Sequence, residues 1–172
     1  MSRDLRYAVW RTDAGWLGVL GSGEGLRRVT LPQRSAEEAV VKLGGAVSQA
    51  EHSTSFFQGL TERLVMYFNG RETAFPDTIA PPGTAFQREV WEAARLIPYS
   101  QTRSYGWVAD QIGKPRAARA VGQALGENPL PVIVPCHRVL AGDGGLGGFT
   151  GGVEVKRYLL RLESPASAAL GK

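Results

Sequence analysis

A proline-rich segment divides this chain into two halves that differ in pattern. Residues 76–83 read PDTIAPPG, and their three prolines disfavour both a helix interior and a central strand. Short apolar runs separated by glycines precede this segment, whereas apolar residues at helical spacing follow it. We therefore expect an α+β fold: a small N-terminal antiparallel-sheet domain (1–80) and a helical, winged helix-turn-helix-like C-terminal domain (84–165), followed by a flexible tail (166–172).

The first half has the pattern of a small sheet with helices packed against it. Short apolar runs are separated by turn residues and lie at 7–9, 16–20 and 26–31. This pattern predicts an antiparallel meander. Helices are expected over 35–43 and 53–68, the second with Ser53 as its N-cap.

Composition excludes general disorder and points away from a membrane. Of the 172 residues, 43% are hydrophobic and 21% are charged, which provides enough apolar surface for a core. No apolar run approaches the roughly 20 residues that span a bilayer, and the N-terminus lacks the apolar stretch of a secretion signal. We expect a monomer without a membrane partner, cytoplasmic in location, or nuclear in a eukaryote.

The net charge of +4 is concentrated in the second half of the chain. Residues 1–82 hold nine Lys and Arg and nine Asp and Glu, whereas residues 83–172 hold eleven against seven. The second half is therefore the part expected to meet a polyanion such as nucleic acid. An excess of this size is also compatible with an ordinary solvated surface.

The second half is predicted to contain a helix-turn-helix. One helix is expected after Thr84, which has Gln87 at capping-box spacing, and another after Ser104. A third helix is expected to have Pro115 in its first turn. The tight connection ahead of Pro115 is typical of a helix-turn-helix.

The third of these helices has a polar face with small residues between the polar ones. Arg116, Arg119 and Gln123 are expected on this face, and Ala118 and Gly122 lie between them. Because small residues let the backbone approach a ligand closely, the face is a candidate DNA-binding surface. The alternative is a solvated basic face on an ordinary helical hairpin.

Cys136 is the only cysteine of the chain, and it follows a predicted apolar strand at 130–134. One cysteine and two histidines can form neither an intramolecular disulfide nor a structural zinc site, so no metal or other cofactor is expected. A thiol attacks as the thiolate, and His137 could take its proton directly or through a water, with Glu163 as a candidate to orient the imidazole. The alternative is a buried core cysteine beside an unrelated histidine.

The segments around this cysteine resemble one known family. The resemblance covers about residues 85–163 and is carried by NPLPV, IVPCHRVL, GGFTGG, KRYLLRLE and the upstream run RSYGWVADQIGKPRAARAVGQALGENP. These segments resemble the O6-alkylguanine-DNA alkyltransferases (methylated-DNA–protein-cysteine methyltransferases). The resemblance implies direct-reversal DNA repair, in which an alkyl group moves irreversibly and stoichiometrically from O6-alkylguanine to the protein. O4-alkylthymine is a second candidate substrate.

The resemblance implies a role for each residue around the thiol. Cys136 would be the alkyl acceptor, and His137 would be its base, acting through a water. Glu163 would be the third member of this relay. Asn128 resembles the family residue that organises the active-site turn and ties it to the recognition helix.

The resemblance also implies how double-stranded DNA would be bound through its minor groove. The target atom lies inside the duplex, so the base must be flipped out at a cost of a few kcal/mol. Arg119 is similar to the arginine that fills the vacancy in the base stack. Tyr105 resembles the tyrosine that promotes rotation of the nucleotide. Backbone groups at Cys136 and Val139 would hold the edge of the guanine, and the base pocket would also be lined by Phe149, Thr150 and Lys156.

One position departs from the family pattern. Phe149 stands where the family commonly has a tyrosine whose hydroxyl contacts the flipped base, so assistance to the leaving group from this side chain is lost. Three other functions remain open: an alkyltransferase-like lesion sensor, a helix-turn-helix regulator and a cysteine hydrolase. A sensor of that kind lacks the acceptor cysteine, which this chain has.

Overall fold

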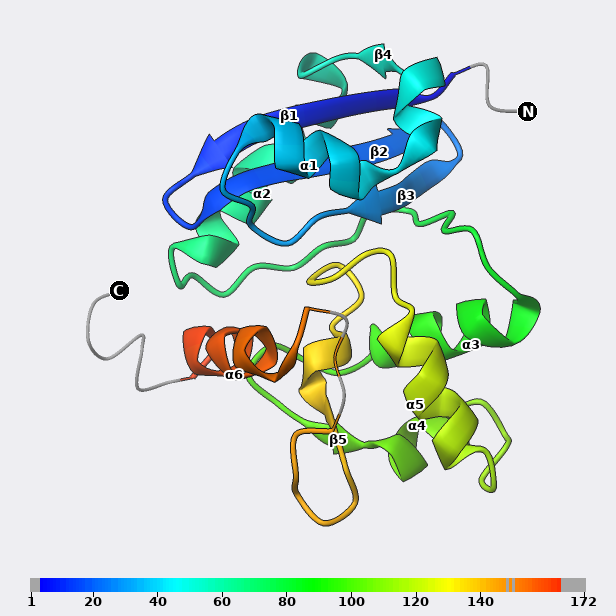
Figure 1. Cartoon of the computed structure of the whole chain (residues 1–172). Helices are drawn as coiled ribbons and strands as arrows, with labels where there is room; N and C mark the ends of the chain where they lie inside the picture. Colours follow the sequence, from blue (N-terminus) through cyan, green and yellow to red (C-terminus); the bar gives the residue numbers. More distant parts are fainter. Residues whose placement is uncertain (1–3, 148, 150, 165–172) are drawn as a thin grey trace. The chain divides into compact units, whose positions relative to one another are not determined.

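The computed structural model describes residues 4–147, 149 and 151–164, and the chain forms two compact units (Figure 1). The units are Met1–Pro82 and Gly83–Lys172. The division falls within the proline-rich segment 76–83. The tail expected at 166–172 lies outside the described residues. Among the described residues, no helix has the length and apolar character needed to cross a bilayer.

The N-terminal unit is built on a four-stranded sheet of order β3-β2-β1-β4. Its strands are β1 (Arg6–Thr12), β2 (Gly15–Ser22), β3 (Gly25–Val29) and β4 (Glu51–His52). The first three form the antiparallel meander that the sequence predicts, whereas β4 pairs parallel to β1. Gly15 has φ +135°, and a Cβ there would lie 2.8 Å from the carbonyl oxygen of Gln33, so the turn between β1 and β2 requires glycine.

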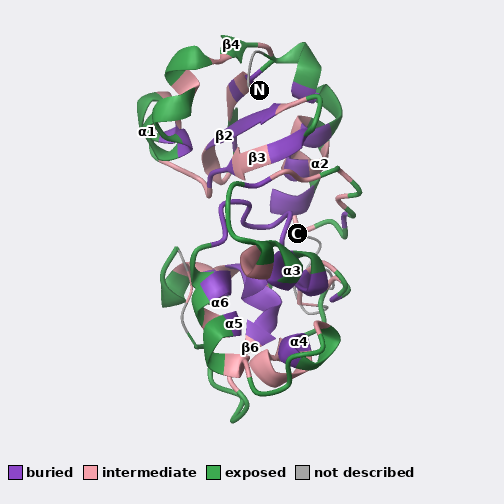
Figure 2. Ribbon diagram, turned by 90° about the vertical axis from the view of Figure 1, so that its right-hand side faces the viewer, coloured by how far each residue is buried: buried purple, intermediate pink, exposed green. Residues whose placement is uncertain are grey.

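Two helices cover the two faces of this sheet (Figures 1 and 2). The helix α1 (Ala36–Leu43) begins after Ser35, whose side chain accepts a hydrogen bond from the backbone of Glu38. The helix α2 (Gln58–Phe68) packs from the other side. Because both faces are covered, most of β2 is buried. Leu43 of α1 packs in one core cluster with Leu5 and Leu20.

The expected helix over 53–68 is wrong at its start. A 3-10 turn, η2 (Ser55–Phe57), precedes α2, and a further one, η1 (Gly45–Gln49), follows α1. The Ser53 hydroxyl accepts from the backbone N–H of Phe56 at 3.3 Å, within the 3-10 turn η2, so Ser53 is not the N-cap of α2.

The C-terminal unit is mainly helical. Its elements are α3 (Ala85–Ala94), β5 (Arg103–Ser104), α4 (Tyr105–Gln111), α5 (Ala118–Gly126), η3 (Cys136–Arg138), β6 (Val139–Leu140) and α6 (Val153–Leu162). The capping box of Thr84 and Gln87 and the cap at Ser104 are present as predicted. Buried Trp91 donates its indole N–H to the carbonyl of Ala124 at 2.8 Å and so ties α3 to α5.

Two local predictions in this unit are wrong. The helix expected around Pro115 begins only at Ala118, because the chain first makes a turn in which the N–H of Ala117 donates to the carbonyl of Lys114. The segment 130–134 is a compact turn and not a strand: Val132 has φ +74°, and the N–H of Val134 donates to Leu130. Its residues are apolar because the turn is buried.

Candidate active site

The sulfur of Cys136 lies at the start of η3 and is held by an amide. Asn128 donates from Nδ2 to Sγ at 3.1 Å and to the carbonyl of Val134 at 3.0 Å. Its Oδ1 accepts from the N–H of Leu130 at 2.8 Å. Asn128, which follows α5, therefore fixes the buried turn that leads into Cys136.

The thiol of Cys136 is buried, with 3% of the residue exposed. Burial raises the pKa of Cys136 to about 11, although the Asn128 hydrogen bond and the positive charge of Lys156 act in the opposite direction. The thiol is therefore protonated at neutral pH in the DNA-free protein. Its ionisation requires a base or a change brought by the substrate.

The imidazole of His137 faces a buried carboxylate. Nε2 of His137 lies 2.6 Å from Oε2 of Glu163, which caps the C-terminus of α6. Burial alone would raise the pKa of Glu163, but hydrogen bonds from His137 and Arg138 outweigh burial and hold it well below its usual range. Burial lowers the pKa of His137 even though Glu163 opposes this. The pair is therefore an ionised carboxylate and a neutral imidazole that donates from Nε2.

The sequence did not reveal how many groups donate hydrogen bonds to the carboxylate of Glu163. Arg138 donates from Nε and Nη2 to its two oxygens at 2.8 and 2.9 Å. The backbone N–H of Ser100 donates to Oε1 at 3.1 Å, from a residue at φ +66° that a non-glycine residue adopts at some cost. The available signal for a buried partner was an arginine placed between His137 and the apolar pair Val139 and Leu140.

A second group of predicted residues meets around a buried lysine. Lys156 is fully buried and donates to the carbonyl of Val139 at 2.7 Å. Its Nζ lies 5.9 Å from the ring centroid of Tyr105. Burial lowers the pKa of Lys156, while Cys136 raises it. A Cβ at Gly147 would collide with the Tyr105 hydroxyl, so the glycine-rich loop lies directly against this ring.

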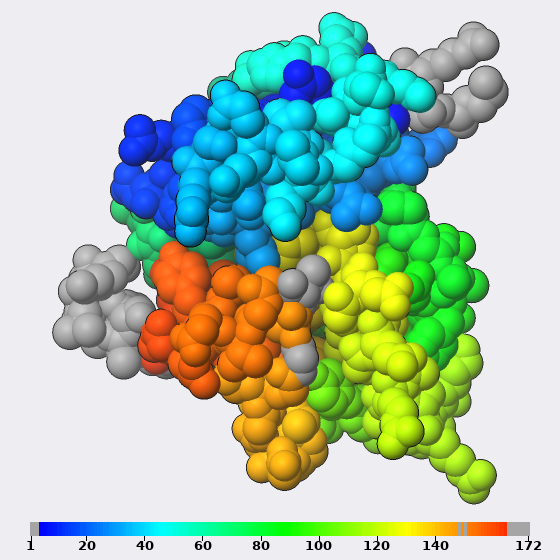
Figure 3. Space-filling model, in the orientation of Figure 1, coloured from blue at the N-terminus to red at the C-terminus, as the bar shows by residue number. Residues whose placement is uncertain are grey.

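The exposed face of α5 carries the predicted polar residues except one. Arg119 and Gln123 are exposed, and Ala118 and Gly122 are half-buried, with the position of Gly122 close to the Tyr105 ring. Arg116 is exposed but lies in the turn before α5. The C-terminal unit presents α5 and the segment that carries α6 on one face (Figure 3).

The remaining predicted residues are less defined by their surroundings. Phe149 is half-buried. Thr150 lies outside the described residues. Among the residues that the structure describes, no group of His, Cys, Asp or Glu is arranged to hold a metal ion.

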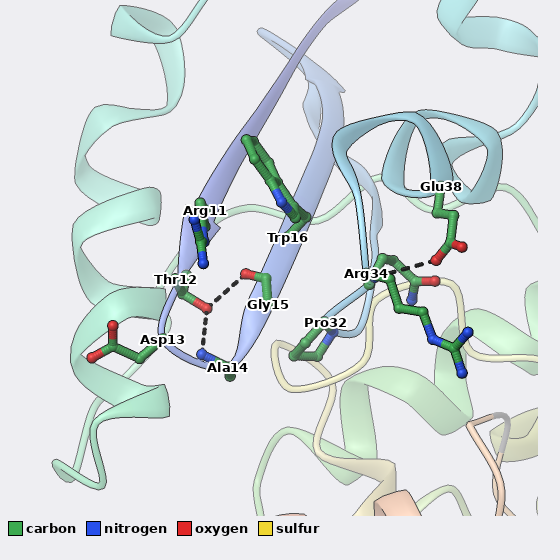
Figure 4. Close-up of a pocket in the computed structure, with 10 residues that line it drawn as sticks. Arg11, Thr12, Asp13, Ala14, Gly15, Trp16, Pro32, Arg34 and Glu38 are labelled. Atoms are coloured by element: carbon green, nitrogen blue, oxygen red, sulfur yellow. Dashed lines mark hydrogen bonds between the residues drawn. The ribbon is translucent and has the colours of Figure 1, made fainter.

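The N-terminal unit has a polar hollow of its own beside the β1–β2 hairpin (Figure 4). Its volume is about 600 Å³, and Arg11, Arg34 and Glu38 contribute charges of both signs to its lining. The hydroxyl of Thr12 donates to the carbonyl of Gly15 at 2.9 Å, and Glu38 accepts from the backbone of Arg34 at 3.2 Å. These bonds hold the hairpin and the start of α1, so the polar residues that line the hollow have a structural role.

The fold and the site define a protein with a sheet unit and a helical unit, the latter carrying a single buried cysteine beside a histidine–carboxylate pair. Residues 85–165 match the DNA-binding domain of 6-O-methylguanine DNA methyltransferases, and residues 5–79 match their ribonuclease-like domain. The chain belongs to this family, the methylated-DNA–protein-cysteine methyltransferases, which repair O6-methylguanine in DNA. The predicted α+β fold and the predicted activity are thereby confirmed.

Individual relatives agree with this assignment over most of the chain. A methylated-DNA–protein-cysteine methyltransferase of Methanosarcina acetivorans is 40% identical over 159 residues, which cover 92% of this chain and 98% of that protein. One of Mycolicibacterium paratuberculosis is 51% identical over 117 residues, or 66% of this chain and 71% of that protein. The crystal structure of Mycobacterium tuberculosis OGT in complex with DNA is 40% identical, with a TM-score of 0.77, and covers 97% of this chain and 99% of that one.

Proposed function

We propose that Cys136 accepts the alkyl group and that each protein molecule acts once. The amide of Asn128 on Sγ and the His137–Glu163 pair directly after it support this assignment. His137 takes the thiol proton, directly or through a water, and Sγ forms a bond to the alkyl carbon as the bond from that carbon to O6 breaks. The guanine leaves with the electron pair and is protonated. The thioether product is stable, so the transfer is irreversible.

The base pocket and the DNA-binding surface are both assigned to the C-terminal unit. We propose that Val139, Phe149 and Thr150 line the pocket for a flipped guanine and that Lys156 supports its wall from behind Val139. The ring of Tyr105 lies close to Gly122 of α5 and to Lys156. Phe149 offers a stacking surface without a hydroxyl, so Tyr105 is the described residue suited to assist the leaving base.

The surface of α5 is proposed to enter the minor groove of double-stranded DNA. Ala118 and Gly122 allow a close approach, and Arg119 fills the space of the flipped base. Arg116 and Gln123 contact the backbone without reading sequence, which suits a protein that must search all DNA. The protein is proposed to act as a monomer in the cytoplasm, or in the nucleus of a eukaryote. O4-alkylthymine is a further candidate substrate.

Intact-mass spectrometry tests the transfer directly. After mixing with a duplex that contains O6-methylguanine, the chain should gain the mass of one methyl group, and excess duplex should add no second one. Peptide mapping should place the methyl group on Cys136. Tight binding without a mass gain would identify a lesion sensor, and turnover of an ester without DNA would identify a cysteine hydrolase. Either result would overturn the proposal.

Arg119→Ala should slow repair of duplex DNA while sparing the chemistry. Without an intercalating side chain, the flipped state loses part of the few kcal/mol that offset unstacking, so we expect roughly a 10- to 100-fold slower transfer from duplex DNA. Single-turnover transfer from duplex and alkylation of the protein by free O6-benzylguanine measure the two steps separately.

Arg116→Ala is the matched control because it removes the same charge from the turn ahead of α5. It should weaken binding through the loss of one phosphate contact and lower the salt dependence of binding by about one counterion. Equal losses of transfer in the two variants would contradict the role given to Arg119. A parallel loss with free O6-benzylguanine would contradict it as well.

A further inference from the structure

The side chain of Arg138 is anchored along its whole guanidinium group. Its Nε and Nη2 donate to the two oxygens of Glu163, and Nη1 donates to the carbonyl of Ile97 at 2.8 Å. The ring of Tyr99 covers it at 5.6 Å. Only 7% of Arg138 is exposed. An arginine bound in this way cannot serve as a phosphate contact, so its charge acts inside the unit.

Arg138 and His137 share one carboxylate. Oε2 of Glu163 lies 2.6 Å from Nε2 of His137 and 2.9 Å from Nη2 of Arg138. A buried carboxylate that faces an imidazole alone favours the imidazolium form. The guanidinium group is permanently positive and neutralises most of this effect. The two hydrogen bonds from Arg138 also fix the plane of the carboxylate and therefore the orientation of the imidazole.

The other positive charge near His137 also favours the neutral imidazole. Lys156 on α6 adds a second positive charge, and the thiol of Cys136 is the neighbouring titratable group on η3. Among the described residues that act on the imidazole, Glu163 carries the negative charge, and Arg138 is its counter-charge. Burial, Arg138 and Lys156 lower the pKa of His137 against the opposing effect of Glu163.

We propose that Arg138 is a positioning residue that keeps His137 uncharged, with its proton on Nε2 and with Nδ1 as the basic nitrogen. It does so by neutralising and orienting Glu163. This inference rests on the proposed role of His137 as the base for Cys136, because only a neutral imidazole can accept the thiol proton. Arg138 itself touches neither the thiol nor the DNA in this account.

Arg138→Gln tests the inference in the full-length, DNA-free protein. The ¹⁵N signals of the imidazole report charge and tautomer, and the chain has only one other histidine, the exposed His52, as an internal reference. Wild-type His137 should be neutral at pH 7, with its proton on Nε2. In Arg138→Gln the unneutralised carboxylate should raise the pKa of His137 by at least one pH unit, which is a tenfold or larger change in the ratio of imidazolium to imidazole. An unchanged titration in the folded variant would overturn the inference.

Two further variants keep the test decisive if Arg138→Gln does not fold. Arg138→Lys retains the charge without the two-pronged contact, so His137 should stay neutral at pH 7 while transfer slows through loss of orientation. The double variant Arg138→Gln with Glu163→Gln leaves no unpaired charge, and its His137 should also stay neutral. An imidazolium at pH 7 in either variant would overturn the claim that Arg138 acts through the charge of Glu163.

The pH profile of transfer separates this inference from the proposed function. If His137 is the base, the acid limb of single-turnover transfer should move to higher pH in Arg138→Gln by the same amount as the imidazole titration. A shifted titration with an unmoved transfer profile would support the role of Arg138 and remove His137 as the base.

Discussion

Cys136→Ser should abolish alkyl transfer and leave the fold and DNA binding largely intact. Serine is close to cysteine in size, and its hydroxyl can accept the hydrogen bond that Asn128 gives to Sγ. A hydroxyl is a far weaker nucleophile than a thiolate, and loss of a nucleophile lowers rates on the order of 10⁶-fold, so no methylated protein should be detected. Intact-mass spectrometry with O6-methylguanine duplex measures transfer, and fluorescence anisotropy measures binding.

Measuring DNA binding and alkyl transfer together in Cys136→Ser separates a loss of chemistry from a loss of binding. Binding within a few-fold of wild type shows that the loss is chemical. Stoichiometric methylation of the Cys136→Ser protein would mean that another residue is the acceptor. Because Cys136 is the only cysteine of the chain, such a product would not be a thioether formed on cysteine.

Glu163→Gln should cost about 3–5 kcal/mol of unfolding free energy at pH 7, because it leaves the Arg138 guanidinium buried without its counter-charge. Urea unfolding followed by circular dichroism measures the change. Glu154→Gln is the matched control on α6: its carboxylate is 84% exposed and pairs with Arg157 at 2.6 Å. A surface pair of this kind contributes little, so a change within about 0.5 kcal/mol is expected.

The effect of Glu163 should depend on pH in a defined direction. Its pKa is lower in the folded protein than in the unfolded chain. Its ionisation therefore stabilises the fold above the unfolded value of about 4.3, and this contribution is lost as the pH falls below that value. The difference in stability between wild type and Glu163→Gln should be constant from pH 7 to about 5 and narrow between about pH 4 and 3. A difference that does not change over this range would contradict the assignment.

The sequence predicted what depends on neighbouring residues. The capping box at Thr84 and the cap at Ser104 are set by local hydrogen bonds. The adjacent Cys136 and His137 were visible for the same reason. The pairing of His137 with Glu163 spans 26 residues, so the residues alone offered Glu163 only as a candidate, and the family resemblance implied the pairing.

What the sequence could not give depends on tertiary contacts. Arg138 is bound by Ile97, 41 residues away, and Ser100 adopts a left-handed backbone that Glu163 stabilises through its N–H. The apolar segment 130–134 has the composition of a strand, but Asn128 folds it into a turn. Pro115 suits the start of a helix as well as a turn, and the chain makes a turn closed by the hydrogen bond from the N–H of Ala117 to the carbonyl of Lys114 before α5 begins.

Burial of Sγ also bears on how long an unspent molecule remains usable. Peroxides and other oxidants attack the thiolate form, and a protonated, enclosed sulfur presents little of it. A protein that acts once, as we propose, loses one future repair with every sulfur that is oxidised in advance. Burial of the sulfur, which limits its reactivity before DNA is bound, therefore also protects it from oxidation. Each protein molecule stays competent for longer until it meets a lesion.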